Sequence, residues 1–243
     1  MSGSLLISPY AHKVAAALLK GTIDPSGVYL VGGCVRDALL RLPSHDLDFV
    51  LEHDSLRVAR MVANLMGGSY YTMDEDFQVG RVVLTDELGR RQLMDFTAMQ
   101  GDALEEDLRN RDFTANAIAV SMADLETLID PLHGAEDLFA KRLRTCSPNS
   151  FLQDPVRVLR AVRMAAAFNL AFLPETRALI SPAVPELDRV SIERQRDEFL
   201  KILDAPKPDT SLRILDRFGV LEKLIPELNR LKGEEQSAPH IYD

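Results

Sequence analysis

Two aspartates, Asp46 and Asp48, are separated by a single residue in an apolar stretch that runs to Leu51. Side chains two residues apart in a β-strand point to the same face, so these carboxylates would lie side by side. Carboxylate oxygens are hard ligands suited to Mg²⁺, and two ions about 4 Å apart can activate an attacking hydroxyl and neutralise a leaving pyrophosphate. The pair therefore indicates a metal-dependent nucleotide-transfer site.

The element before this pair supplies a complementary feature. An apolar run, Val28 to Val31, leads into Gly32 and Gly33, and the next segment is typical of a short helix that carries Arg36. Because glycine has no Cβ, backbone N–H groups can approach a triphosphate closely at the start of that helix. Arg36 would add a fixed positive charge against the phosphates. Together with the two acids, this order of elements predicts a nucleotide site.

The composition fits a cytoplasmic enzyme. Of the 243 residues, 46% are hydrophobic and 27% are charged, which is enough for one sizeable core or two modest ones. No apolar run approaches the ~20 residues of a membrane span and no signal peptide is evident, so we expect no membrane partner. Cys34 and Cys146 are expected to be reduced, packed thiols. The net charge of −9 restricts RNA contacts to local basic patches.

One such patch follows Asp154, which suits a helix N-cap, with Pro155 at the first helical position. At about 100° per residue, Arg157, Arg160 and Arg163 fall on one side of this helix and apolar residues fall on the other. No glutamate at i±4 compensates these arginines. We expect this face to meet a ligand; a solvated cationic helix face is the ordinary alternative.

The segment LVGGCVRDALLRLPSHDLD resembles the first motif of the class II tRNA nucleotidyltransferases and bacterial poly(A) polymerases, which reads roughly LVGGxVRDxLLGxxxxDxD. Arg41 stands where the family has a glycine, and the residues expected to do chemistry are unchanged. The resemblance implies that Asp46 and Asp48 hold Mg²⁺ as catalytic ligands. It also implies that the glycine pair and Arg36 hold the triphosphate.

Two further segments are similar to family motifs. The stretch EEDLRNRDFTANAIAV resembles EEDLxRRDFTINAIA, with Asn110 replacing the first arginine, and implies that Arg111 and Asn116 contact triphosphate and ribose. The ordinary structural interpretation of this stretch is a capped helix that begins near Asp112. The cationic helix resembles the family's neck motif E-D-x-x-R, which reads QDPVR from Gln153.

The neck resemblance gives the basic helix a specific role. It implies that Asp154 and Arg157 hydrogen-bond the base edge of CTP or ATP, and that Arg160 and Arg163 make further nucleotide contacts. Asp95, in the strand-like run RRQLMDFTAMQG, is a candidate third metal ligand, because relatives carry an acid there; a simple strand-end aspartate is the alternative. The segment from Asp95 to Leu104 is shorter than in many CCA-adding relatives, so the resemblance points toward a CC-adding enzyme, with a CCA-adding one as the alternative.

The resemblance runs from Ser4 to about Leu228 and implies the α/β head of the nucleotidyltransferase (polymerase β-like) fold, with a mixed sheet, followed by an all-α neck. We expect a catalytic head at 1–147, a nucleotide-selecting helical neck at 148–212, and the start of a truncated helical body at 213–243.

The implied activity is template-independent addition of C, A or both from CTP and ATP to a tRNA 3′ end. A poly(A) polymerase and a non-catalytic RNA-binding relative are the alternatives within the family. A dinucleotide-binding oxidoreductase also opens with strand, glycines and helix, but VGGCVRD lacks the G-x-G-x-x-G fingerprint. The sequence does not indicate an oligomeric state.

Overall fold

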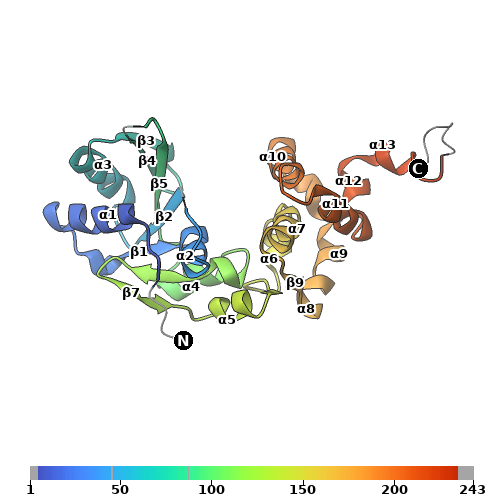
Figure 1. The fold of residues 1–243 in the computed structure, drawn as a ribbon, viewed down its shortest axis with the longest axis horizontal. Helices are drawn as coiled ribbons and strands as arrows, with labels where there is room; N and C mark the ends of the chain where they lie inside the picture. Colours follow the sequence, from blue (N-terminus) through green and yellow to red (C-terminus); the bar gives the residue numbers. More distant parts are fainter. Residues whose placement is uncertain (1–4, 45, 87, 235–243) are drawn as a thin grey trace. The chain divides into compact units, whose positions relative to one another are not determined.

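The computed structural model describes residues 5–44, 46–86 and 88–234, and the chain divides into two compact units, Met1–Phe139 and Ala140–Asp243 (Figure 1). The predicted boundaries after residues 147 and 212 stay predictions, and the end of the predicted third segment, 235–243, lies outside the described residues. Within the described ranges, no helix is both long enough and apolar enough to cross a membrane.

The first unit is built on a seven-stranded sheet with the strand order β3-β4-β5-β2-β1-β6-β7. Every neighbouring pair is antiparallel except β2 and β5, which run parallel, so the sheet is mixed, as predicted. The strands are β1 (Val28–Val31), β2 (Asp46–Leu51), β3 (Ser69–Asp74), β4 (Val79–Thr85), β5 (Arg91–Ala98), β6 (Ala119–Ser121) and β7 (Asp124–Ile129).

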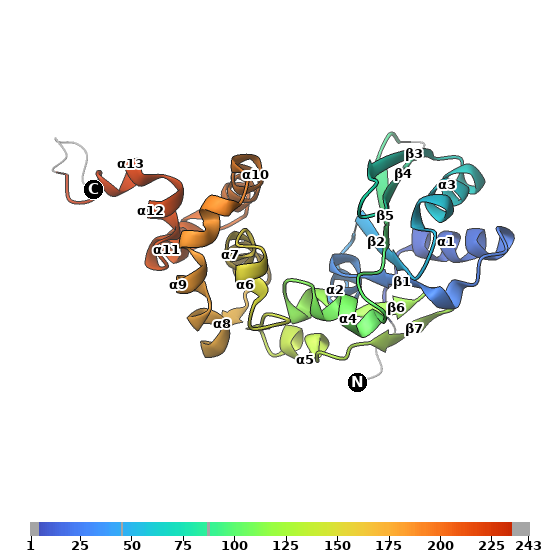
Figure 2. The ribbon, with the colours of Figure 1, turned by 180° about the vertical axis from the view of Figure 1, so that it is seen from behind.

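Helices cover the apolar face of this sheet. Buried side chains of α1, α2 and α3 join those of the strands in one core, and Figures 1 and 2 show α1 and α3 side by side. Phe49 of β2 and Phe96 of β5 stack in this core with ring centroids 4.7 Å apart. The helices of this unit are α1 (Pro9–Lys20), α2 (Gly33–Leu39), α3 (Ser55–Met66), α4 (Leu104–Arg109) and α5 (Gly134–Phe139), with 3₁₀ turns η1 (Pro25–Gly27) and η2 (Thr114–Asn116).

The second unit is mainly helical, as predicted for the neck, with one short parallel pair of strands, β8 and β9. Its longest helices are amphipathic, and their apolar sides pack together: α7 contacts both α10 and α11. The elements are β8 (Arg142–Leu143), α6 (Ser150–Gln153), α7 (Arg157–Phe168), β9 (Ala171–Phe172), α8 (Pro174–Ala178), α9 (Ile180–Ala183), η3 (Pro185–Arg189), α10 (Ile192–Leu203), α11 (Pro208–Arg217), α12 (Val220–Leu224) and α13 (Pro226–Asn229).

The predicted start of the basic helix is wrong. Helix α7 begins at Arg157 with Val156 at the N-cap, and Asp154 instead ends the preceding helix, α6. The backbone oxygen of Asp154, not its carboxylate, accepts the Arg157 N–H at 3.0 Å. The Asp154 carboxylate accepts a hydrogen bond from Arg194 at 2.8 Å, so tertiary pairing replaces the expected cap.

The capped helix expected near Asp112 is also wrong. Only a 3₁₀ turn forms at Thr114–Asn116, and the chain then enters strand β6, which pairs with β1. The Asp112 carboxylate accepts the Phe113 N–H at 2.8 Å and a hydrogen bond from the Asn116 side chain at 3.0 Å. Sheet pairing therefore stops the helix before it completes a second turn.

Candidate active site

A row of charged side chains crosses three neighbouring strands of the first unit. Asp48 of β2 is in register with Asp95 of β5, which is in turn in register with Arg81 of β4. Asp46 lies two residues before Asp48 and therefore on the same face of β2. Leu47 between them is only 1% exposed and belongs to the core on the opposite face. The structure thus brings the two predicted carboxylates together.

Negative charge is concentrated around Asp48. Burial raises the pKa of the Asp48 carboxyl above its ordinary value, and the nearby charges of Asp95 and Asp46 raise it further, while Arg111 and Arg81 oppose the rise. A buried carboxylate beside two other acids is costly to ionise without a counter-charge. A divalent cation at this place would provide one.

Gly32 lies where Asp48 and Arg111 approach each other. Its φ is +78°, and a Cβ there would be 3.2 Å from Nη1 of Arg111 and 3.6 Å from Oδ2 of Asp48. Any larger residue would therefore push into the guanidinium and strain the backbone. The Gly32 N–H donates to the carbonyl of Ile118 at 3.2 Å and is therefore already hydrogen-bonded within the protein. Gly33 follows as the first residue of α2.

Arg36 and Asn116, predicted from separate motifs, meet in the structure. Nη1 of Arg36 donates to Oδ1 of Asn116 at 2.6 Å, and its Nε and Nη2 donate to Oδ1 of Asp37 at 2.9 and 2.8 Å. The Asn116 side chain in turn donates to Asp112. These contacts hold the guanidinium of Arg36 in one orientation beside the glycine turn.

Arg111 is oriented by an acid that the sequence analysis did not single out. Nε and Nη2 of Arg111 donate to Oδ2 of Asp107 at 3.2 and 3.0 Å, and Asp107 is only 7% exposed. Asp107 also accepts the Gln100 N–H at 3.1 Å, which ties it to the segment after β5. The spacing of four residues between Asp107 and Arg111 could have indicated this pairing from the sequence, because side chains four residues apart on a helix are neighbours.

The donor set fits a divalent cation bound by a pair of carboxylates. Among the residues that the structure describes, no group of three or more His, Cys, Asp or Glu side chains is arranged to hold a metal ion. Mg²⁺ is commonly held by one or two protein carboxylates together with substrate phosphates and water, so Asp46 and Asp48 suffice. Both oxygens of Asp95, the third predicted ligand, accept hydrogen bonds from Arg81 at 2.7 Å.

In the second unit, the two residues predicted to read the base are neighbours. Nε of Arg157 is 4.0 Å from Oδ2 of Asp154, and its Nη1 donates to the Ser150 hydroxyl at 3.0 Å. Because Asp154 also accepts from Arg194, the carboxylate and both guanidiniums form a small polar cluster. Arg194 was not singled out in the sequence, since it lies on a different helix, α10.

Two arginines of α7 are compensated by an acid on another helix. Glu198 of α10, whose side chain is 8% exposed, accepts from Nε of Arg163 at 2.8 Å and lies 3.7 Å from Nη1 of Arg160. Burial acts to raise the pKa of Glu198, but Arg163, Lys201 and Arg160 outweigh it and leave the pKa below its ordinary value. The compensating acid comes from a second helix rather than from i±4.

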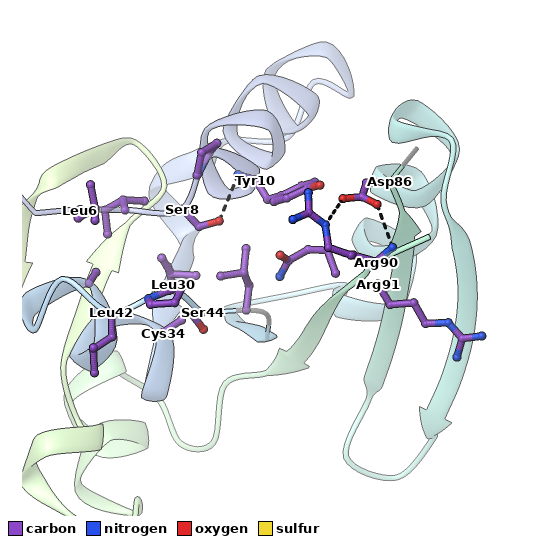
Figure 3. Close-up of a pocket in the computed structure, with 16 residues that line it drawn as sticks. Leu6, Ser8, Tyr10, Leu30, Cys34, Leu42, Ser44, Asp86, Arg90 and Arg91 are labelled. Atoms are coloured by element: carbon purple, nitrogen blue, oxygen red, sulfur yellow. Dashed lines mark hydrogen bonds and ion pairs between the residues drawn. The ribbon is translucent and has the colours of Figure 1, made fainter. Parts of the chain in front are cut away.

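A cavity of about 380 Å³ lies on the other face of the sheet (Figure 3). Leu30 and Leu47 line it, so it opens away from the aspartates that alternate with Leu47. Cys34 also lines it; its Sγ donates to the Val31 carbonyl at 3.1 Å, and burial raises its pKa to about 12. Cys34 is thus a free, packed thiol, as predicted, and the charged row is a separate site.

Comparison with known proteins identifies the family. Residues 28–144 match the model of the poly(A) polymerase head domain, and residues 169–232 match a probable RNA- and SrmB-binding site of polymerase A. The chain is 44% identical over 203 residues to a CC-adding tRNA nucleotidyltransferase of Geobacter sulfurreducens, covering 84% of this chain and 46% of that protein. This chain belongs to the class II tRNA nucleotidyltransferase and poly(A) polymerase family.

Other members of the family support this assignment. A multifunctional CCA protein of Verminephrobacter eiseniae is 38% identical, covering 88% of this chain and 54% of that one. The structure of a Thermotoga maritima CCA-adding enzyme complexed with tRNA superposes with a TM-score of 0.80 at 31% identity, covering 91% and 54% of the two chains. The chain therefore spans about half the length of the curated relatives it matches.

The family assignment confirms the predicted nucleotidyltransferase head fold. Nucleotidyltransferases of this family are generally metal-dependent, which agrees with a carboxylate pair on β2. The three segments that resemble family motifs fall on β1, α2 and β2, on the segment around Arg111, and on the junction between the end of α6 and the start of α7. The individual roles of their side chains stay predictions.

Proposed function

We propose that this chain transfers CMP, AMP or both from CTP and ATP to the 3′-hydroxyl of an RNA, namely a tRNA end, with release of pyrophosphate. The observation that carries the proposal is the place of Gly32, whose missing side chain lets Arg111 and Asp48 approach each other over its backbone. A positive group for phosphates and a carboxylate for a cation thus lie within one small region. The Geobacter and Thermotoga relatives, named for tRNA nucleotide addition, support this substrate class.

The proposed reaction needs an acid pair and two arginines. Asp46 and Asp48 would hold Mg²⁺, which supplies polarisation of the phosphoryl oxygens and activation of the attacking hydroxyl. Arg111 and Arg36 would bind the triphosphate, and backbone N–H groups at the start of α2, near Gly33, would donate to a phosphate oxygen. The RNA 3′-oxygen then bonds to the α-phosphorus while the bond from that phosphorus to the pyrophosphate oxygen breaks.

The second unit would choose the base. A carboxylate that accepts and a guanidinium that donates can together read the base edge of CTP or ATP, and Asp154 and Arg157 are adjacent. Asn116 would contact the ribose. Arg160 and Arg163 would add nucleotide contacts; Glu198 binds Arg163 through Nε, and the two terminal nitrogens of Arg163 can still donate.

The proposed specificity leans toward C addition. The connection between β5, which ends at Ala98, and α4, which begins at Leu104, is short, and this is the segment from which the sequence resemblance pointed toward C addition. The name of the Geobacter relative agrees with this preference. A cytoplasmic location goes with tRNA as substrate and stays a prediction.

An incorporation assay tests the proposal. The purified chain would be incubated with Mg²⁺ and labelled CTP or ATP on three RNAs: a tRNA transcript ending before CCA, one ending after CC, and oligo(A). We expect metal-dependent CMP incorporation on the first transcript and none with the double variant Asp46→Asn, Asp48→Asn. Incorporation that persists in that variant or in EDTA would contradict the proposed site, and preference for oligo(A) would indicate a poly(A) polymerase instead.

A further inference from the structure

The ion pair between Arg81 and Asp95 occupies an unusual place for a structural salt bridge. The two residues are cross-strand partners on β4 and β5, and Nε and Nη2 of Arg81 each donate to a different oxygen of Asp95 at 2.7 Å. The side chains are 33% and 23% exposed, so the pair is partly shielded from water. Such a two-point contact between guanidinium and carboxylate is among the strongest polar pairings in proteins.

The pair lies directly beside the proposed cation site. Asp95 is in register with Asp48 on the adjacent parallel strand, so both project from the same face of the sheet. Arg81 is in register with Asp95 on the next strand, so the three residues form one row across β2, β5 and β4. Without Arg81, three carboxylates would therefore face a cation; with Arg81, one of the three is already neutralised and geometrically fixed.

We propose that Arg81 sets the number of carboxylates at the cation site by holding Asp95 in the ion pair, so that only Asp46 and Asp48 bind the metal. Arg81 is thus a positioning residue that acts through Asp95. The inference rests on the proposed function, because it takes Asp46 and Asp48 to be the metal ligands. It agrees with the absence, among the described residues, of a group of three acids placed to hold a metal.

This arrangement has a functional purpose. Each protein carboxylate added to a magnesium site takes a coordination position that substrate phosphates or water would otherwise occupy. A site limited to two carboxylates leaves more positions for the triphosphate and for the attacking hydroxyl. Removing Arg81 should therefore convert a weak, substrate-completed site into a tighter, protein-completed one.

Direct cation binding tests the inference without any turnover. Binding of Mn²⁺ to the whole chain, free of nucleotide, would be followed by electron paramagnetic resonance of the unbound ion. We expect Arg81→Met, which keeps an unbranched side chain but removes its charge and donors, to bind Mn²⁺ about tenfold more tightly than wild type, because a third carboxylate becomes available to the cation. Arg81→Lys keeps the charge but loses the two-point contact, so its Mn²⁺ affinity should lie between those of wild type and Arg81→Met. Equal Mn²⁺ affinity in wild type and Arg81→Met would overturn the inference.

The Asp95→Asn variant distinguishes two causes of tighter Mn²⁺ binding: a new ligand contributed by Asp95, and the mere loss of a positive charge nearby. Removing any nearby positive charge favours a cation, so the effect of Arg81→Met is measured both in the wild-type chain and in the Asp95→Asn variant, as a double-mutant cycle. We expect the full gain only when the carboxylate of Asp95 is present. Equal gains in the two backgrounds would show that Asp95 does not become a ligand and would also overturn the inference.

Two more variants complete the design. Arg57→Met is the matched control, because Arg57 pairs with Asp54 at the surface, where the side chains are 67% and 61% exposed, and should leave Mn²⁺ affinity unchanged. If Mn²⁺ binding persists in the Asp46→Asn, Asp48→Asn double variant, the cation site of the proposed function is wrong. If binding is lost there but Arg81→Met matches wild type, only the role of Arg81 is wrong. Thermal unfolding of each variant confirms that it is folded.

Discussion

The two units of this chain hold their arginines in different ways. In the first unit, Arg36 is held by the adjacent Asp37, and Arg111 is held by Asp107 four residues earlier. Each of these two acids lies in the same short segment as the arginine that it orients, and Arg36 additionally donates to Asn116 of a later segment. A sequence motif in this unit therefore carries both the functional group and the acid that fixes it.

In the second unit, Arg157 has the local partners Ser150 and Asp154, but the other supports come from another helix. Glu198 of α10 holds Arg163 of α7, and Arg194 of α10 binds Asp154. The geometry of the proposed base-reading cluster consequently depends on how α7 and α10 pack. The comparison indicates that local substitutions should damage the first site directly, while the second can be altered from a distance.

The largest effect is expected at the center of the first site. Asp48→Asn should lower nucleotide incorporation by roughly a thousandfold or more, because metal stabilisation of the transition state is worth several kcal/mol. Incorporation of labelled CTP measures the loss.

The same variant should be more stable than wild type at neutral pH without metal. The pKa of Asp48 is raised in the folded state, so its contribution to stability is present below the unfolded-state pKa and is lost as pH rises through the folded-state pKa. The amide that replaces this carboxyl in the variant cannot ionise and avoids that loss. Thermal unfolding in EDTA at pH 8 should show a higher midpoint; a lower midpoint would attribute the inactivity to misfolding.

Arg157→Ala tests whether the second unit contacts the nucleotide at all. Loss of hydrogen bonds from a charged donor should weaken CTP binding by about 10- to 100-fold. Titration of the purified variant with CTP and ATP measures this, and Arg196→Ala is the control, since Arg196 forms an exposed pair with Asp197. Unchanged affinity in Arg157→Ala would mean that Arg157 does not contact the nucleotide. The two units could then no longer be compared as two parts of one nucleotide site.

Gly32→Ala measures how tightly the first site is built. We expect a loss of about 2 kcal/mol in the free energy of unfolding, because alanine is strained at positive φ and its Cβ would press on Arg111. Gly67→Ala is the control: its φ is +70° with nothing within 4 Å, so only the ordinary left-handed penalty of about 1 kcal/mol applies. Equal losses in chemical denaturation would show that Arg111 simply moves aside.

Glu198→Gln is the smallest expected change and probes the support between helices. Replacing the charged acceptor should cost about 1.5 kcal/mol in the free energy of unfolding at pH 7. The pKa of Glu198 is lowered in the folded state, so its stabilisation is present above the unfolded-state pKa and is lost as pH falls through the folded-state pKa. The difference from wild type should therefore shrink in acid; a difference that persists there would mean that packing, not charge, is responsible.

Features set by local periodicity could be predicted from the sequence. Alternation along β2 placed Asp46 and Asp48 on one face, and the 100° spacing placed Arg157, Arg160 and Arg163 on one side of a helix. The glycine turn between strand and helix was also expected, because few other residues allow its backbone geometry. These predictions needed no knowledge of distant partners.

Features that depend on tertiary pairing were missed. Asp154 looked like an N-cap by its position before Pro155, but Arg194 binds its carboxylate and the helix begins later. The role of Asp95 as a metal ligand stays a prediction, but its pairing with Arg81 was not foreseen, because it follows from the β4–β5 register. An acidic or basic residue on a second element can redirect a side chain in ways that local spacing does not encode.

The parallel pairing of β2 with β5 in the seven-stranded sheet has a consequence for assembly. Helix α3 and strands β3 and β4 lie between β2 and β5 in the sequence. Asp48 and Asp95 therefore become neighbours only after this intervening segment has folded and β5 has paired with β2. Bringing like charges together opposes this closure, and a cation bound to the finished row would favour the closed sheet by mass action. Metal supply would thereby stabilise the newly synthesised chain as well as serve its chemistry.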